Sequence, residues 1–131
     1  MVLPPDWAAS TTVDSLVAHY RAVAEKIPVM VVTGFLLRRS DQFGLDVIKA
    51  LRDHVPGVVA LKDDKTGPWI RKVCLMTHDR WALSAGGQKQ NHMNMVPYGV
   101  GGSIRPIGSN SIPSRDLLTL RWTSTQRWGA W

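Results

Sequence analysis

Short apolar segments alternate with amphipathic stretches over most of this 131-residue chain, and this alternation constrains the fold more than any other feature. The segments at residues 29–32 and 58–61 consist entirely of apolar residues, as do strands that are buried on both faces of a parallel sheet. Between the segments, apolar residues recur at spacings of three and four, which is typical of one face of a helix. Strand starts are expected near positions 1, 29, 58, 81 and about 102. The pattern therefore predicts consecutive βα units and an α/β fold with a parallel sheet.

Start signals for helices fall between these segments. The hydroxyl side chains of residues 10–12 are candidate N-caps for a helix that ends near Lys26, and Ser40 is the candidate cap of a second helix. A third helix is expected to begin at Pro68, because proline is tolerated in the first turn. A fourth helix is expected over residues 88–96.

The composition is typical of a soluble globular protein. It includes 44% hydrophobic and 20% charged residues, which excludes disorder throughout and a collagen-like repeat. No apolar run approaches the roughly 20 residues of a membrane span, and the first residues lack the features of a secretion signal. Cys74, the single cysteine, can form neither an internal disulfide nor a Cys-x-x-Cys metal pair. We therefore expect a cytoplasmic protein that does not bind membranes.

The net charge of +6 is distributed unevenly. Residues 105–131 contain four arginines and one acidic residue and so carry half of it, whereas charges of both signs are interleaved over residues 1–104. This distribution disfavours a basic nucleic-acid-binding module, so no nucleic acid is expected as a partner. The apolar rhythm also stops near Ile104. We expect a structured unit over residues 1–104 and an irregular tail over residues 105–131.

The remaining motifs give no sign of a metal or nucleotide site. The four histidines lack metal-ligand spacings such as His-x-x-x-His. The glycine-rich stretches at residues 86–87 and 99–102 fit neither the P-loop nor the dinucleotide-binding fingerprint. We therefore expect neither a metal nor an organic cofactor.

Lys62 is the candidate catalytic residue, because it ends an otherwise apolar strand. In parallel α/β proteins, ligands and catalytic groups gather at the carboxyl ends of the strands. An ammonium at such a position is partly removed from water, which favours the neutral amine that a Schiff-base enzyme uses as its nucleophile. The alternative is a structural role, in which Lys62 pairs with Asp63 or Asp64. The residues alone leave both interpretations open.

Four motifs in sequence order resemble a known family. They lie at residues 28–32, 57–67, 82–86 and 99–104, and the second reads Gly-Val-Val-Ala-Leu-Lys-Asp-Asp-Lys-Thr-Gly. They are similar to the second half of the dihydrodipicolinate synthase and N-acetylneuraminate lyase family, whose Schiff-base lysine lies in a motif of this kind. The resemblance covers about residues 1–104. It implies a partial (β/α)8 barrel, roughly strands four or five to eight, from a family of class I aldolases and lyases.

The resemblance implies that Lys62 is the Schiff-base nucleophile and that the substrate is pyruvate or a related 2-keto acid. In such enzymes the amine adds to the keto carbon, water is lost, and the resulting iminium acts as an electron sink for carbon–carbon or carbon–oxygen bond chemistry. Full-length relatives are expected to be homo-oligomers. Together with their positions near strand ends, the motifs indicate these candidate substrate-binding residues: Thr33, Ser84, Gly86, Gly102 and Ile104.

Two departures from the family pattern concern the reaction. Relatives that condense pyruvate carry Thr-Pro-Tyr-Tyr where this chain has Leu-Pro-Pro-Asp-Trp at residues 3–7, so the proton-relaying tyrosine is absent. Asp6 is then either an acid–base group or a surface residue. The family often has Asn-Val-Pro-x-Arg after the next strand. This chain has Thr-Gly-Phe-Leu-Leu-Arg at residues 33–38, so that Arg38 is displaced by one position from the arginine of the family motif. These departures put the synthase reaction in question more than the imine chemistry.

The resemblance also implies that the first half of the barrel is missing, since a complete barrel needs roughly 250 residues. The arginine, serine and tryptophan content of residues 105–131 leads to the hypothesis that this tail is translated in a shifted frame. A half barrel has open edges, so we expect poor solubility or self-association. A non-catalytic remnant of the family is therefore the alternative to a lyase.

Overall fold

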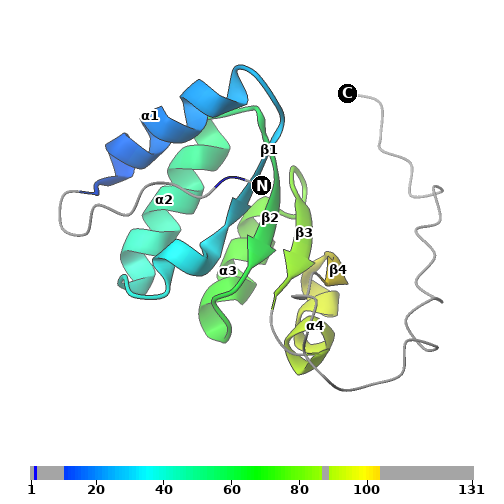
Figure 1. Ribbon diagram of the computed structural model, residues 1–131. Coiled ribbons are helices and arrows are strands. Elements are labelled where there is room, and N and C mark those ends of the chain that lie inside the picture. Colours follow the sequence, from blue (N-terminus) through cyan, green and yellow to red (C-terminus); the bar gives the residue numbers. More distant parts are fainter. Residues whose placement is uncertain (1, 3–10, 87–88, 104–131) are drawn as a thin grey trace, which may run out of the picture.

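The computed structural model describes Val2, residues 11–86 and residues 89–103, and it shows four parallel strands that alternate with helices (Figure 1). The strands form one sheet in the order β1-β2-β3-β4, with each strand next to the one that follows it in the chain. The predicted α/β class with a parallel sheet is thus confirmed. In chain order the elements are α1 (Val13–Ala24), β1 (Val29–Val32), the 3-10 helix η2 (Thr33–Leu36), α2 (Asp41–His54), β2 (Val58–Asp63), α3 (Pro68–Thr77), β3 (Ala82–Ala85), α4 (Lys89–Met95), the 3-10 helix η3 (Val96–Tyr98) and β4 (Val100–Ser103).

The element boundaries differ from the predicted ones at several points. The strand expected at the start of the chain is, within the described residues, a single parallel bridge between Val2 and Val31. The strand expected to end with Lys62 continues to Asp63, because Asp63 still pairs with Ala85 of β3. Ile104, Asp6 and the tail lie outside the described residues. No helix in the described part of the chain has the length and apolar character that a membrane crossing requires.

The helices begin where the sequence signals indicate. At the start of α1 the Thr12 hydroxyl accepts a hydrogen bond from the backbone N–H of Ser15, and the Ser15 hydroxyl accepts one from Thr12, which together form a capping box. The Ser40 hydroxyl accepts from the N–H of Phe43 at the start of α2. Pro68 opens α3, where its missing N–H costs no helical hydrogen bond.

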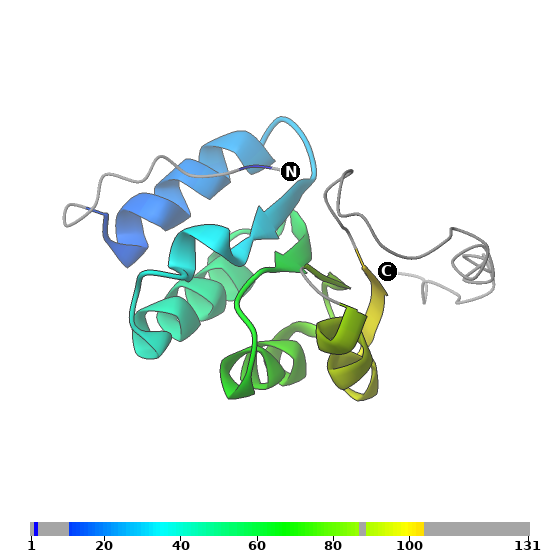
Figure 2. The same ribbon diagram turned by 60° about the horizontal axis from the view of Figure 1, so that its bottom comes forward.

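The two faces of the sheet have different surroundings. Successive side chains of a strand point to opposite faces, and Val31, Leu61 and Leu83 are paired across β1, β2 and β3 on the face that forms the buried core with the helices. Consecutive parallel strands joined by right-handed crossovers bring all their helices to the same face. Figure 2 shows the helices arranged in an arc along that one side of the sheet.

The opposite face carries a second row of residues across the four strands. We call Val32, Lys62, Ser84 and Gly102 the Lys62 row, because the register pairs Val32 with Lys62, Lys62 with Ser84, and Ser84 with Gly102. The described helices lie on the other side of the sheet. The candidate nucleophile and two of the candidate substrate-binding residues therefore share one face near the carboxyl ends of the strands.

Candidate active site

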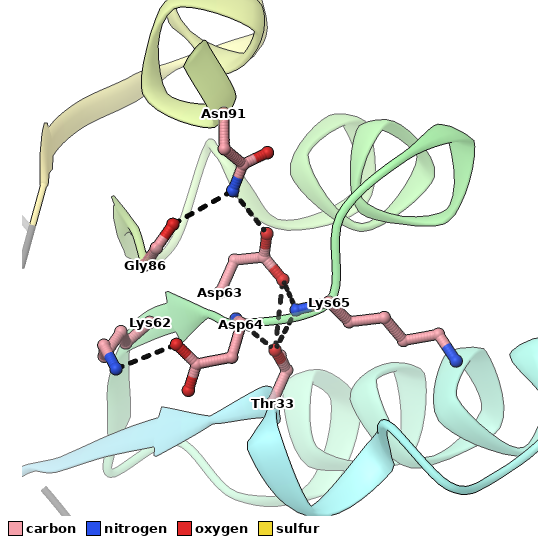
Figure 3. A network of polar contacts seen from close by, with 7 residues as sticks. All are labelled: Thr33, Lys62, Asp63, Asp64, Lys65, Gly86 and Asn91. Carbon is pink, nitrogen blue, oxygen red and sulfur yellow. Dashed lines mark hydrogen bonds and ion pairs between the residues drawn. The ribbon is translucent and has the colours of Figure 1, made fainter. Parts of the chain in front are cut away.

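Lys62 forms an ion pair with Asp64 on the face of the sheet that the described helices leave uncovered (Figure 3). The Lys62 Nζ lies 2.8 Å from Asp64 Oδ1, and the two side chains are 16% and 25% exposed. The sequence left open whether Lys62 pairs with Asp63 or Asp64, and the structure shows that Asp64 is the partner. The amine is therefore close to a carboxylate and still reachable from solvent.

Ser84 is the neighbour of Lys62 on β3. Its Oγ is buried and has no hydrogen-bond partner within the described part of the chain. Buried hydroxyls are nearly always hydrogen-bonded, so an unpartnered one on the strand beside a charged amine makes Ser84 a candidate ligand-binding residue. A Cβ placed at Gly102, the next residue of the Lys62 row, would meet no atom of the described residues within 4 Å.

Asp63 points to the opposite face from Lys62 and is 1% exposed. Its Oδ1 accepts hydrogen bonds from the Thr33 hydroxyl at 3.0 Å and from the Lys65 backbone N–H at 2.7 Å, and its Oδ2 accepts one from the Asn91 amide at 3.4 Å. Burial raises the pKa of Asp63 from its ordinary value of 3.8 to about 6, although these three hydrogen bonds favour the ionised form. The buried Asp63 carboxylate thus links η2, the loop after β2 and α4.

Thr33, a candidate substrate-binding residue, lies directly after β1 at the start of η2. Its side chain is fully buried, and its hydroxyl donates to Asp63 while it accepts from the backbone N–H groups of Asp64 at 2.7 Å and Lys65 at 3.2 Å. A hydroxyl has one proton and two lone pairs, so none remains for a substrate. The contribution of Thr33 is to hold the start of the loop after β2, and with it the backbone of Asp64.

Gly86 lies directly against the two acidic residues (Figure 3). Its N–H donates to the backbone oxygen of Asp63 at 2.5 Å, and its own carbonyl accepts from the Asn91 amide at 3.1 Å. A Cβ at position 86 would overlap both Asp63 O and Asp64 Oδ1. Glycine is therefore required here by close approach rather than by an unusual backbone angle.

Asn91 of α4 supplies a side chain to this network that the sequence analysis did not single out. A polar residue on a short polar helix gives no distinguishing signal, because such residues usually face solvent. Its amide instead bridges Gly86 O and Asp63 Oδ2, which ties α4 to the ends of β2 and β3.

The other nucleophilic and metal-binding groups of the described residues do not contribute to the site. Cys74 is buried, and burial together with the nearby charge of Asp63 raises the pKa of its thiol to about 12, so the reactive thiolate is disfavoured. Lys65 directs its amine away to Asp41, at 2.9 Å, and to two backbone oxygens. The described residues include no group of three His, Cys, Asp or Glu side chains that could hold a metal ion.

The chemistry available at this edge of the sheet is therefore that of an amine, a carboxylate and a hydroxyl in neighbouring positions. An amine can add to a carbonyl, a carboxylate can carry the protons of that addition, and a buried hydroxyl can bind an anionic oxygen. Comparison of the chain with family models, with curated proteins and with solved structures finds no match.

Proposed function

We propose that the protein is a class I aldolase or lyase in which Lys62 forms a Schiff base with pyruvate or a related 2-keto acid. The observation that carries the proposal is the position of the Lys62 amine. It is partly buried on the face that the described helices leave uncovered, beside a carboxylate and a hydroxyl that has no hydrogen-bond partner among the described residues. Sites at the carboxyl ends of parallel strands are where α/β enzymes hold their catalytic groups.

In this reaction the amine of Lys62 adds to the keto carbon, and the oxygen of the former carbonyl leaves as water. The resulting iminium withdraws electrons from the adjacent carbon, so that loss of a proton or cleavage of a carbon–carbon bond gives an enamine. The enamine can then attack an aldehyde or expel a leaving group.

The carboxylate of a 2-keto acid requires a partner, and Ser84 supports this part of the proposal. Its Oγ lies buried on the strand next to Lys62 and has no hydrogen-bond partner among the residues that the structure describes. A 2-keto acid bound through its keto carbon to Lys62 has its carboxylate one bond away, within reach of a neighbouring side chain. We assign Ser84 the role of donating a hydrogen bond to that carboxylate.

The fold supports a related proposal about the architecture. A sheet of parallel strands in consecutive order, with its helices on one side, is the arrangement from which a (β/α)8 barrel is built. We propose that β1 to β4 correspond to consecutive strands of such a barrel, with the Lys62 row on its inner face. Association with further copies of the chain would cover the open edges of the sheet.

Reductive trapping tests the proposed function. Incubation of the full chain with pyruvate followed by borohydride should add the mass of one pyruvate, less one water and plus two hydrogens, at Lys62. The adduct is quantified by intact mass and located by peptide mapping, and Lys62→Ala should abolish it. Lys65 is a matched internal control, because its side chain is 13% exposed and also ion-paired to an aspartate.

The same experiment separates the proposed function from its alternative. An ion pair between Lys62 and Asp64 is also what a purely structural lysine at a strand end would form. If Lys62 is structural, the adduct is absent or spread over many lysines, including Lys65. That result would make the chain a non-catalytic remnant.

Ser84→Ala gives a second, milder prediction. Loss of a hydrogen bond to a charged group costs about 1.5–3 kcal/mol, so the pyruvate concentration that gives half-maximal trapping should rise about tenfold or more. The maximal amount of adduct should be unchanged, because the amine is retained. Titration of the adduct yield against pyruvate measures the shift. An unchanged half-maximal concentration would remove Ser84 from the substrate site.

A further inference from the structure

The carboxylate of Asp64 occupies a slot between two glycines, Gly34 of η2 and Gly86 directly after β3. A Cβ at Gly86, after β3, would overlap Asp64 Oδ1, and a Cβ at Gly34, after β1, would lie 3.3 Å from Asp64 Oδ2. The second distance is shorter than ordinary van der Waals contact. Both flanking positions must therefore lack a side chain, or nearly so, for the carboxylate to lie where it does.

The backbone of Asp64 is fixed as firmly as its side chain. Its N–H donates to the Thr33 hydroxyl at 2.7 Å, and Thr33 is itself held by the buried carboxylate of Asp63 at 3.0 Å. Side-chain and backbone constraints thus converge from the ends of β1, β2 and β3. The Asp64 side chain nevertheless remains 25% exposed, so a small molecule at Lys62 can also reach it.

The second lysine–aspartate pair provides a contrast. Lys65 and Asp41 lie 2.9 Å apart, but Asp41 is 69% exposed and stands on the surface of α2. An exposed pair of this kind needs no slot and contributes little to stability. The close fit around Asp64 is more than a surface ion pair requires, and it resembles the supported geometry of a group that must meet its partner at a defined distance.

We propose that Asp64 is the general acid–base that carries the protons of imine formation at Lys62. This inference rests on the proposed function and deepens it. Asp64 Oδ1 contacts the reacting nitrogen directly, at 2.8 Å, and this distance is within hydrogen-bond reach for proton transfer.

The proton transfers balance through the whole sequence. The Asp64 carboxylate takes a proton from the Lys62 ammonium, and the neutral amine adds to the keto carbon, whose π electrons move to oxygen. Asp64 returns its proton to that oxygen and takes another from the now cationic nitrogen, which gives the carbinolamine. It then protonates the hydroxyl, water leaves, and the nitrogen lone pair forms the iminium. Asp64 ends as a carboxylate, and the net reaction is ammonium plus ketone to iminium plus water.

The test compares Asp64→Asn with Asp41→Asn, which breaks the matched lysine–aspartate pair outside the site. Each full-length variant is mixed with saturating pyruvate, quenched with borohydride at increasing times, and analysed for the Lys62 adduct by mass. A second measurement follows the reaction of Lys62 with trinitrobenzenesulfonate, which needs a free amine but no dehydration step. Circular dichroism establishes that each variant is folded.

Asp64→Asn is expected to slow imine formation about 100-fold or more at neutral pH, while trinitrobenzenesulfonate labelling of Lys62 is not slowed. Loss of a purely electrostatic partner would instead free the amine and speed both reactions. Asp41→Asn should change neither rate. Gly34→Ala, which retains every polar group and only crowds Oδ2, should give a smaller decrease in the imine rate and serves as the second variant if Asp64→Asn does not fold.

The outcomes distinguish this inference from the proposed function. If the wild-type chain forms the Lys62 adduct and Asp64→Asn forms it equally fast, Asp64 is not the acid–base group, and the lyase proposal stands. If the wild-type chain forms no adduct, both proposals fail together.

Discussion

Gly86→Ala is expected to destabilise the fold by about 3 kcal/mol, at the upper end of what overpacking usually costs. The added Cβ would overlap the backbone oxygen of Asp63 as well as Asp64 Oδ1. A flexible side chain could move aside, but Asp63 O is part of β2 and already accepts the Gly86 N–H at 2.5 Å. Relief of the clash therefore requires β2 and β3 to separate at their carboxyl ends.

Gly102→Ala is the matched control for this prediction. It also replaces a glycine of the candidate site on the neighbouring strand, yet within the described part of the chain its added Cβ would meet nothing within 4 Å. It should leave stability unchanged or raise it slightly, because alanine restricts the unfolded chain. Urea unfolding of both variants and the wild-type chain measures the free energies. Equal stability of Gly86→Ala and wild type would show that the sheet edge adjusts to a methyl group.

The order of elements could be predicted from the sequence because periodicity and capping act locally. The apolar runs that became β1 and β2 and the cap at Ser40 depend only on neighbouring residues, and each appears close to its expected position. The position of Lys62 at the carboxyl end of a strand followed from the same local pattern. Within the described residues, the expected first strand is represented by a single bridge between Val2 and Val31. The extent of pairing with β1 depends on contacts that the apolar pattern of a short segment does not specify.

The partner of Lys62 depends on which face each residue occupies. Lys62 and Asp63 are consecutive in β2, so their side chains point to opposite faces, and Asp64 is the first acidic residue able to return to the Lys62 face. That argument requires β2 to continue through Asp63, which is set by pairing with β3. The apolar run at residues 58–61 gave no indication that the strand continues to Asp63.

The supports of the site come from three separate segments and could not be predicted. Thr33, Asp63 and Asn91 meet only because η2, β2 and α4 converge, and no spacing along the chain encodes their distances. The slot for Asp64 is harder still to predict from the sequence. It exists because Gly34 and Gly86 have no side chains, and nothing in the sequence indicates that these two glycines lie on either side of the Asp64 carboxylate.

The buried carboxylate of Asp63 is expected to make the protein less stable as the pH rises from about 4 to about 7. Burial raises its pKa in the folded state to about 6, above the ordinary value of 3.8 that applies to the unfolded chain. Between these values the folded state binds more protons than the unfolded state, so the free energy of unfolding falls with rising pH. The stabilisation is fully present below pH 3.8 and is lost as the pH passes through about 6. The difference corresponds to about 3 kcal/mol.

Asp63→Asn isolates this contribution from those of all other titrating groups. The asparagine is neutral at every pH, and its carbonyl can still accept from Thr33 and from the Lys65 N–H. Its own NH2 can donate to Asn91 only if the Asn91 amide rotates and gives up its hydrogen bond to Gly86 O, a cost that is the same at every pH and does not change the pH dependence. Urea unfolding at several values between pH 4 and pH 7 gives the stability difference between variant and wild type. That difference should shift by about 3 kcal/mol in favour of the variant across the range, since only the wild type must keep a charge in the core. A difference that is constant with pH would mean that Asp63 titrates alike in the folded and unfolded states, and that its three hydrogen bonds offset the cost of burial in full.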